Sequence, residues 1–371
     1  MLFSKKSDMN MNVIILTNMP TPYRIPMFEL LSKKVSSLTV AYCVEREANR
    51  NWEVNKNDNI VKYKKLLNKT IDIRGKYIHL SLEMISFILM NRKSIFIVGD
   101  ASYNSYIAVF LMKILGIKYI LWTGWTSSSF VKNSIGGFLK KNMIKNASAI
   151  LSYGTYTTKT ISKYSGDIPT FNLNNTIDND FFLNIKASLS DKDKDKDKDK
   201  YRLVYTGQLI ERKNILSIID AIKDISNIEL VLIGDGNNQY INEIKELAKK
   251  NNATVFFLGN LSPYEIYKEY NNSDCFILPS FDEPWGLVVN EALLFGLPVI
   301  VSDHVGCHFD LVNSLNGVVT RGNSLDIREA IIKVMEHHYD SDRISSSLQL
   351  VSSPNYSVSN IMKAINNVNE K

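Results

Sequence analysis

The chain has 371 residues, of which 45% are apolar, enough to bury two hydrophobic cores of ordinary domain size. Its three cysteines, Cys43, Cys275 and Cys307, are widely separated and form no CxxC pair, which argues against a disulfide framework or a zinc site. Residues 1–180 hold 24 Lys and Arg against 12 Asp and Glu, a net charge of +12, and the remainder holds 20 against 26, a net charge of −6. A basic half suits anionic lipid headgroups or a pyrophosphate-linked acceptor, and a solvated lysine-rich face is the alternative interpretation. Nucleic acid is disfavoured as a partner, because no basic motif is interleaved with aromatic residues.

The apolar runs are too short to predict a membrane span. The run at residues 12–16 cannot serve as a signal peptide or a transmembrane helix. The longest tract, residues 106–122, is interrupted by Lys113 and Lys118, and its Gly116 favours a helix, a turn and a strand over one span. We therefore expect a cytoplasmic protein, either free or peripheral on the inner face of the cytoplasmic membrane.

The first half alternates buried strands with helices, which is typical of a doubly wound parallel α/β sheet. A strand at residues 12–16 leads through the loop PTPYRIP, residues 20–26, into a helix at 25–33. Another helix is predicted at 102–115. Further strands are predicted at 38–43, 94–98, 119–122 and 149–152. Ligands of such a sheet gather at the carboxyl ends of its strands.

A repeat of five Asp-Lys pairs occupies residues 191–200. A neutral polyampholyte has no apolar residue to bury, so this repeat predicts a linker or a solvated loop. The predicted organisation is therefore an amino-terminal domain at 1–178, a linker at 179–200, a carboxyl-terminal domain at 201–354, and a last helix at 355–371 that packs back on the first domain. Asp178 and Asp180 have the spacing of an Asp-x-Asp metal motif, but a structural role is favoured, and no metal is predicted.

The second half repeats the α/β pattern, and four of its strands run into Gly or Pro-Ser turns. Backbone amides at such turns can approach a nucleotide closely. The predicted strands cover 202–205, 229–233, 255–258, 275–278 and 299–302. Two carboxylates follow, Glu283 in a loop and Glu291 on a predicted helix at 290–295, eight positions apart. Without further motifs, the simpler interpretation is that Glu283 is a buried helix-capping residue and Glu291 a surface residue of the helix.

Five motifs in the second half occur together in a characteristic order. They are GQL at 207–209 with Lys213-Asn214, GDG at 234–236, FLG at 257–259, EPWG at 283–286 and GLPVI at 296–300. With the E-x7-E spacing of Glu283 and Glu291, the chain resembles a GT-B glycosyltransferase of family 4. The resemblance is nearly complete over about 150 carboxyl-terminal residues, and the amino half matches mainly through residues 20–26 and Trp122. It implies two Rossmann-like domains that face a central cleft.

The resemblance implies a metal-independent donor site. Lys213 and Arg212 would meet the donor diphosphate and neutralise the leaving group, although many relatives carry Arg where this chain has Gln208. Glu283 would lie near the donor sugar, and Glu291 would bind the ribose. The remaining donor-site residues would be Gly207, Gln208, Asp235, Leu258, Gly286, Leu287 and Val288. For Asp235, a turn-stabilising role is as plausible, and for Leu258 the alternative is ordinary core.

Acceptor-side candidates come from the first half. Tyr23 and Arg24 follow the first strand, and Trp122 ends a later one, although Arg24 fits a core-edge ion pair equally well. Asp100 and Thr123 also end predicted strands, but no general base is assigned. The five histidines show no ligand spacing and are interpreted as structural or surface residues: His79, His304, His308, His337 and His338.

The sequence thus predicts a retaining glycosyltransferase that moves a sugar from a nucleotide-sugar donor to a glycan acceptor. The acceptor class implied is a lipid-linked O-antigen, capsule or other surface polysaccharide precursor. The donor is a substrate, and no cofactor is expected. A nucleotide-sugar 2-epimerase of the same fold and a noncatalytic nucleotide-sugar-binding subunit are the alternatives. A double displacement with Glu283 as nucleophile also stays open.

Overall fold

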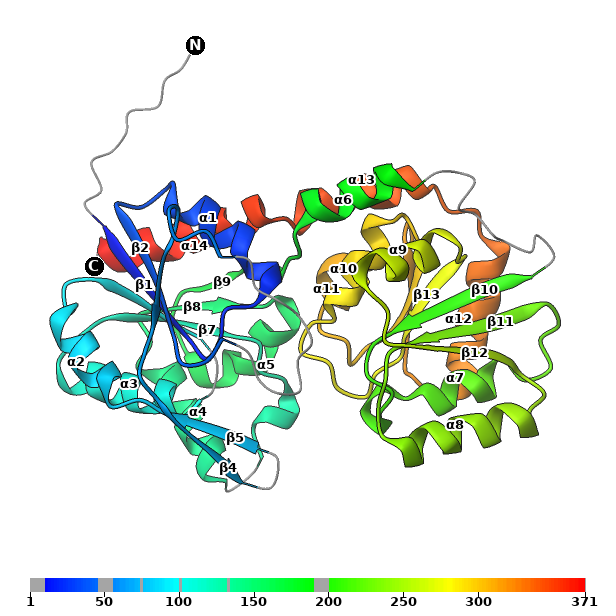
Figure 1. Cartoon of the computed structure of the whole chain (residues 1–371), viewed down its shortest axis with the longest axis horizontal. Helices are drawn as coiled ribbons and strands as arrows, with labels where there is room; N and C mark the ends of the chain where they lie inside the picture. The colour runs from blue at the N-terminus through cyan, green and yellow to red at the C-terminus, as the bar shows by residue number, and fades with distance from the viewer. Residues whose placement is uncertain are drawn as a thin grey trace, which may run out of the picture. The chain divides into compact units, whose positions relative to one another are not determined.

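The structure is a computed structural model, and it describes residues 11–45, 56–73, 76–99, 102–131, 134–189 and 200–370. The chain divides into two compact units (Figure 1). Unit 1 holds the chain up to Tyr153, Thr157–Leu173 and the segment from Pro354 onward. Unit 2 holds Gly154–Tyr156 and Asn174–Ser353. Asp100 and most of the Asp-Lys repeat, residues 191–199, lie outside the described residues.

Unit 1 is built on a parallel sheet with the strand order β3-β2-β1-β6-β7-β8-β9. Its central strands are those that the apolar runs predict, because a parallel strand is covered on both faces and reads as a continuous apolar segment. They are β1 (Asn12–Thr17), β2 (Ser37–Tyr42), β6 (Ile95–Gly99), β7 (Tyr119–Thr123) and β8 (Ala149–Ser152). The edge strands β3 (Lys62–Lys65) and β9 (Thr170–Asn172) escape prediction, since one is lysine-rich and the other is three residues long.

Alternate side chains of β1 enter two cores on opposite faces of this sheet. Val13 and Ile15 pack with α1 (Ile25–Ser32) and α14 (Pro354–Asn369). Ile14 and Leu16 pack on the other face with α2 (Glu83–Met90), α3 (Tyr103–Ile114), α4 (Ile135–Lys145) and α5 (Thr155–Ser165) (Figure 1). A separate antiparallel hairpin joins β4 (Lys69–Ile73) to β5 (Lys76–Leu80). Among the described residues, no helix combines the length and the apolar character needed to cross a membrane.

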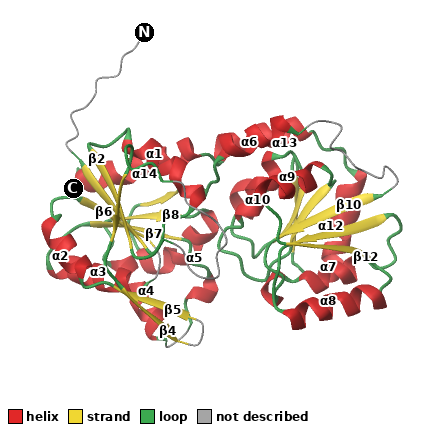
Figure 2. Cartoon of the chain, in the orientation of Figure 1, coloured by secondary structure: helices red, strands yellow, loops and turns green. Residues whose placement is uncertain are grey.

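Unit 2 has a second parallel sheet, in the order β12-β11-β10-β13-β14-β15, with helices on both faces (Figure 2). The strands are β10 (Tyr201–Thr206), β11 (Ile228–Ile233), β12 (Thr254–Gly259), β13 (Cys275–Leu278), β14 (Val299–Ser302) and β15 (Gly317–Thr320). The helices are α6 (Asn179–Ser188), α7 (Ile215–Ala221), α8 (Asn238–Lys250), α9 (Pro263–Asn271), α10 (Leu287–Leu294), α11 (His308–Leu311), α12 (Ser324–Glu336) and α13 (Ser341–Val351).

The segment expected as a linker, residues 179–200, begins as a helix. Asp178 accepts a hydrogen bond from Phe181 N at 3.1 Å and caps α6, which belongs to unit 2. An Asp at this position satisfies an amide that has no intrahelical partner. Asp178 of the Asp178-x-Asp180 pair therefore has the structural role that the sequence favoured, since it caps a helix.

The last helix belongs to unit 1 although unit 2 precedes it in the chain. α14 contacts α1, β7, β8 and β9, and Ser357 Oγ donates to Leu173 O at 3.0 Å. Its buried stripe, which includes Val358, Ile361 and Ile365, is part of the core behind β1. Spacings of three and four residues place these side chains on one helix face.

Candidate functional site

The carboxyl ends of β10, β11 and β12 meet through glycines. Gly207 N donates to Ile233 O at 2.9 Å, and Gly234 N donates to Gly259 O at 2.7 Å. Gly234 has a φ of +130°, and a Cβ there would overlap Gly207 O. Only glycine fits this position, because it tolerates the dihedral and leaves room for the neighbouring loop. The result is an edge of unit 2 where backbone is not shielded by side chains.

Lys213 lies in a tight turn that a single asparagine holds in place. The 3₁₀ turn Glu211–Lys213 ends at Asn214, whose backbone is left-handed with φ 60° and ψ 39°. Asn214 Nδ2 donates to Pro279 O at 3.0 Å and to Gly322 O at 2.7 Å. Arg212 and Lys213 thus precede α7, which begins at Ile215. Asparagine is among the residues that accept a left-handed backbone most readily.

The loop that carries Glu283 is fixed from two sides by backbone hydrogen bonds. Glu283 N donates to His304 O at 3.0 Å, and Gly306 N donates to Glu283 O at 2.8 Å. On the other side, Phe281 N donates to Arg212 O at 2.9 Å. The carboxylate of Glu283 is thus held next to the turn that carries Arg212 and Lys213.

Glu283, Lys213 and Arg212 form an ionic cluster, although about 70 residues separate the carboxylate from the cations. Lys213 Nζ and Glu283 Oε2 are in direct contact, and Arg212 Nη1 lies 3.4 Å from the same oxygen. The side chains of Lys213 and Glu283 are only 11% and 15% exposed, and that of Arg212 is 40% exposed. Two cations against one carboxylate leave a net positive charge in a partly desolvated place. Such a cluster can stabilise an anion that develops beside it.

Downstream of Glu283, a glycine allows the chain to enter α10. Gly286 has φ 94° and ψ 66° and is the N-cap of this helix. The helix starts at Leu287, three residues before the predicted start at Asn290. Leu287 and Val288 lie in its first turn and are half-buried, and amides in a first turn have no intrahelical acceptor. Trp285 Nε1 donates to Asn290 Oδ1 at 2.9 Å and links the loop to the helix.

Glu291 lies on α10, apart from the ionic cluster and next to the buried Tyr270. Its carboxylate is 3.5 Å from Tyr270 OH, and burial raises the pKa of Glu291 to about 8. Withdrawal from water disfavours the charged form of a carboxylic acid. Glu291 is therefore largely protonated near neutral pH in the ligand-free protein, and a ligand that supplies hydrogen-bond donors would favour its ionisation.

The raised pKa of Glu291 predicts how stability depends on pH. Its pKa is about 8 in the folded protein and 4.5 in the reference state, so between these values the folded chain holds a proton that the unfolded chain has lost. The free energy of unfolding should therefore fall as pH rises through this range, by about 5 kcal/mol in total. Glu291→Gln cannot ionise and lacks this contribution.

Thermal unfolding of the wild type and Glu291→Gln at a series of pH values measures this effect. The unfolding midpoint of Glu291→Gln should exceed that of the wild type by a margin that grows from about pH 5 to about pH 9. Glu265→Gln serves as the matched control, because Glu265 is an exposed capping residue whose pKa is lowered by hydrogen bonds from Ser262. A margin for Glu291→Gln that does not change with pH would contradict the prediction.

The other predicted donor residues of unit 2 lie around the same edge. Gln208 is exposed, and its carbonyl accepts a hydrogen bond from Tyr205 OH at 2.8 Å. Asp235 is also exposed and accepts from Gly236 N at 2.8 Å, which is the turn-stabilising role considered above. Leu258 is half-buried in edge strand β12, so it is not core. Beside Arg212 is a hollow of ≈ 250 Å³, lined also by Ile210, Glu211, Asn237, Gln239, Tyr240 and Glu243.

In unit 1 the acceptor-side candidates form a stacked, mostly covered group. The guanidinium of Arg24 lies 4.3 Å from the ring centre of Trp122, and its Nη2 donates to Tyr153 OH at 2.7 Å. Arg24 and Trp122 are 5% and 3% exposed, whereas Tyr23 is half-buried and closer to solvent. Arg24 and Trp122 are therefore buried at this edge of the sheet, where they contact each other.

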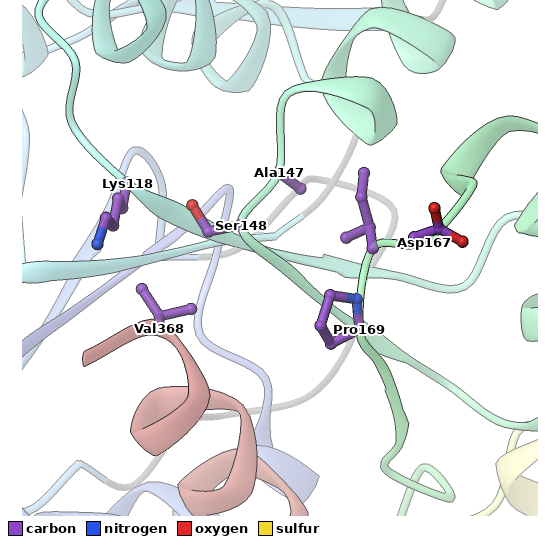
Figure 3. A pocket seen from close by; sticks show the side chains of 7 residues that line it. Lys118, Ala147, Ser148, Asp167, Pro169 and Val368 are labelled. Atoms are coloured by element: carbon purple, nitrogen blue, oxygen red, sulfur yellow. The ribbon is translucent and has the colours of Figure 1, made fainter. Parts of the chain in front are cut away.

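A larger hollow in unit 1 lies at the opposite edge of its sheet. It measures ≈ 370 Å³ and is lined by Lys118, Ala147, Ser148, Asp167, Ile168, Pro169 and Val368 (Figure 3). Lys118, Ser148 and Pro169 each directly precede a strand, so this hollow is at the amino ends of β7, β8 and β9. Parallel sheets bind ligands at the carboxyl ends instead.

Three contributing residues were not singled out from the sequence. Asn214 orients Lys213, Tyr205 holds the Gln208 loop, and Tyr153 contacts Arg24. Asn214 belongs to one of the motifs, but the motif alone does not indicate its role; Asn is among the residues that adopt a left-handed backbone most readily. The tyrosines act through contacts that only the fold creates. The histidines behave as expected where they are buried: His79 contacts Thr70, and His308 contacts Val305 O.

Known proteins are similar in sequence to part of the chain, and known structures are similar in fold to nearly all of it. Residues 188–347 match the family described as glycosyl transferases group 1. The uncharacterised glycosyltransferase MJ1178 of Methanocaldococcus jannaschii is 28% identical over 136 residues, which are 36% of this chain and 38% of MJ1178. The capsular polysaccharide biosynthesis glycosyltransferase CapM of Staphylococcus aureus is 28% identical over 153 residues, 40% of each chain. The matches thus span less than half the length of these relatives.

A crystal structure of Anabaena Alr3699/HepE in complex with UDP and glucose resembles the chain with a TM-score of 0.71. The identity is 14%, and the similarity covers 96% of this chain and 99% of HepE. At this identity the likeness concerns the fold, and it extends over both units. The chain therefore has the GT-B fold of two Rossmann-like domains, and its residues 188–347 are similar to glycosyl transferases group 1.

Proposed function

We propose that the protein is a retaining, metal-independent glycosyltransferase of family 4 that moves a sugar from a nucleotide-sugar donor to a glycan acceptor. The observation that carries the proposal is the convergence of Lys213, Arg212 and Glu283 beside glycine loops at the carboxyl edge of unit 2. The family match over residues 188–347 supports it, as does the resemblance to HepE, a protein seen with UDP and glucose.

Departure of a nucleoside diphosphate builds negative charge on the β-phosphate. Lys213 and Arg212 provide that stabilisation when the diphosphate occupies the glycine-lined edge, in place of a metal ion. The amides of Leu287 and Val288 in the first turn of α10 add donors for phosphate and sugar oxygens. Preorganised donors of this kind lower a barrier because they need no reorientation during the reaction.

Glu283 has a different task, since it already accepts from both cations. With the diphosphate bound, the cations are shared, and the carboxylate faces the positive charge that develops on the sugar ring. The acceptor hydroxyl attacks from the side on which the phosphate leaves and loses its proton to that phosphate, so the anomeric configuration is retained. Glu291 takes the ribose hydroxyls and becomes ionised on binding.

The acceptor is proposed to be a lipid-linked precursor of a surface polysaccharide, used at the inner face of the cytoplasmic membrane. Supporting observations are the basic first half of the chain and the similarity to CapM, a capsular polysaccharide biosynthesis glycosyltransferase. Tyr23, which is half-buried beside Arg24 and Trp122, is the acceptor-side residue with the most accessible side chain of the three.

Calorimetric titration with UDP-, GDP-, ADP- and dTDP-sugars in the presence of a chelator tests the donor part of the proposal. One nucleotide class should bind without metal, and Lys213→Met should bind it more weakly than Lys249→Met, a control at an exposed lysine on α8. Conversion of the donor to its 2-epimer without acceptor would favour the epimerase instead. Failure of all four classes to bind would overturn the proposal.

A further inference from the structure

One helix of unit 1 has an apolar stripe on the side that faces away from the core. Tyr103, Ile107, Phe110 and Ile114 of α3 are 53%, 39%, 60% and 66% exposed. Spacings of four, three and four residues align them along one helix face. The opposite face of α3, which includes Ala108, Val109 and Met112, is fully used in the core against the sheet. The exposed stripe therefore lies outside the core that α3 forms with the sheet.

The stripe is part of a larger surface. α2 and α4 lie beside α3 on the same side of the sheet (Figures 1 and 2). We call the exposed apolar side chains of these helices and their flanking residues the apolar face: Leu82, Leu89, Met90, Tyr103, Ile107, Phe110, Ile114, Leu115, Val131, Ile135 and Phe138. These residues are eleven of the 25 large apolar side chains that are exposed among the described residues, within one stretch of 57. Large apolar side chains exposed together on neighbouring helices are typical of an interaction site.

The charges on and beside the helices of the apolar face are mostly positive. Residues 101–166 contain eight lysines and no Asp or Glu. Within α2, the acidic residue Glu83 is paired with Lys64 at 2.9 Å. Lys113 and Lys145 are exposed near the carboxyl ends of α3 and α4, and Arg92 and Lys93 are exposed just after α2. Because these helices run opposite to the parallel strands, their carboxyl ends lie along one rim of the face.

The sign of these charges decides between two occupants. A second copy of the chain docked through the same face would bring the lysines of both copies together, which opposes association. An anionic lipid surface complements them, and apolar side chains can enter the boundary between headgroups and acyl chains. We propose that the apolar face docks unit 1 on an anionic lipid bilayer.

This inference rests on the proposed function, and it identifies the surface through which the protein would reach a lipid-linked acceptor. The stripe on α3 begins at Tyr103, just after the carboxyl end of β6, because α3 follows that strand. Arg24, Trp122 and Tyr153 lie at the same carboxyl edge of the sheet. A lipid tail held in the bilayer would thus be next to the edge where the acceptor group is expected.

Co-sedimentation of the full chain with vesicles tests the proposal. Vesicles of equimolar phosphatidylcholine and phosphatidylglycerol should bind the wild type, and salt or pure phosphatidylcholine vesicles should weaken the binding. The variant Ile107→Gln, Phe110→Gln, Ile114→Gln should bind at least about tenfold more weakly, because three side chains lose their apolar burial. Lys113→Glu with Lys145→Glu should bind more weakly at low salt only.

The matched control places the same kind of change on unit 2. Leu325, Ile332 and Leu350 are exposed apolar residues of α12 and α13, and their triple substitution by Gln should leave vesicle binding unchanged. Vesicle binding by the α3 variant that equals the wild type would overturn the proposal. So would a wild type that ignores vesicles but forms a dimer that the α3 variant abolishes. Donor binding measured without vesicles separates these failures from a failure of the proposed function, since the α3 variant leaves unit 2 intact.

Discussion

Replacing Lys213 with Met is expected to lower the rate of donor turnover by roughly 10²- to 10³-fold. The side chain of Lys213 is 11% exposed and contacts the carboxylate of Glu283, so its charge acts in a partly desolvated place. Met retains the length and the apolar stem but removes the cation. The measurement is the initial rate of nucleotide release with saturating donor and acceptor. Arg212→Met should cost less, because the side chain of Arg212 is 40% exposed and 3.4 Å from the carboxylate.

Two comparisons separate a chemical effect from a structural one. Lys213→Arg keeps the charge and should recover part of the lost rate, whereas a purely steric role would not follow the charge. Lys249→Met, at an exposed position on α8, should leave the rate unchanged. A rate for Lys213→Met within about threefold of the wild type would remove Lys213 from the proposed role in leaving-group stabilisation.

Replacing Gly234 with Ala is expected to destabilise unit 2 by about 3 kcal/mol or more, and to weaken donor binding. The new Cβ would overlap Gly207 O, and the backbone has a φ of +130°, which side chains rarely tolerate. Both costs fall at the junction of the β10 and β11 loops, so relief of the overlap requires these loops to separate. The thermal unfolding midpoint and the calorimetric affinity for the donor measure the two effects.

Gly259→Ala is the matched control for Gly234→Ala. Gly259 also has a positive φ, +67°, but a Cβ there would meet nothing within 4 Å. Its substitution should therefore cost only about 1 kcal/mol of backbone strain. Equal destabilisation by the two substitutions would show that overlap of the new Cβ with Gly207 O is not the main cause of the cost at Gly234.

The central strands of both sheets could be predicted because their apolar runs are continuous. Residues 149–152, 275–278 and 299–302 form strands with the predicted bounds. Edge strands could not be found in the same way, since β3 is made of the polar sequence KYKK and gains its ladder only from β2. The start of α10 was misplaced because Gly286 caps the helix with a left-handed backbone, a choice that depends on the preceding loop.

Motifs in the sequence nominate the residues of the candidate site, but they do not predict its geometry. Glu283 and Lys213 were chosen from motifs, but no local pattern states that they form an ion pair across 70 residues. That pairing requires β10 to lie beside β13, which brings the Lys213 turn next to the Glu283 loop. The sequence did not predict burial either. The raised pKa of Glu291 and the small exposed fraction of Trp122 both depend on packing.

The exposed apolar face illustrates a different limit. Periodicity in residues 102–115 predicts a helix, yet α3 is apolar on both sides, and the sequence does not tell which stripe faces the sheet. The structure assigns Ala108, Val109 and Met112 to the core and leaves Phe110 and Ile114 in solvent. The net charge of +12 on residues 1–180 can be counted from the sequence, but only the structure shows which side chains lie on the surface near those charges.

Transfer of labelled sugar from the donor to a lipid acceptor is the decisive test of the proposed glycosyltransferase activity. The full chain is incubated with a chelator, a donor labelled in its sugar, and a membrane lipid extract, beside Lys213→Met under the same conditions. The wild type is expected to move label into the lipid fraction and to release nucleotide, and Lys213→Met is expected to do so at least about 100-fold more slowly. Label that stays in the donor, or that is recovered as an epimer of the donor, would contradict this expectation.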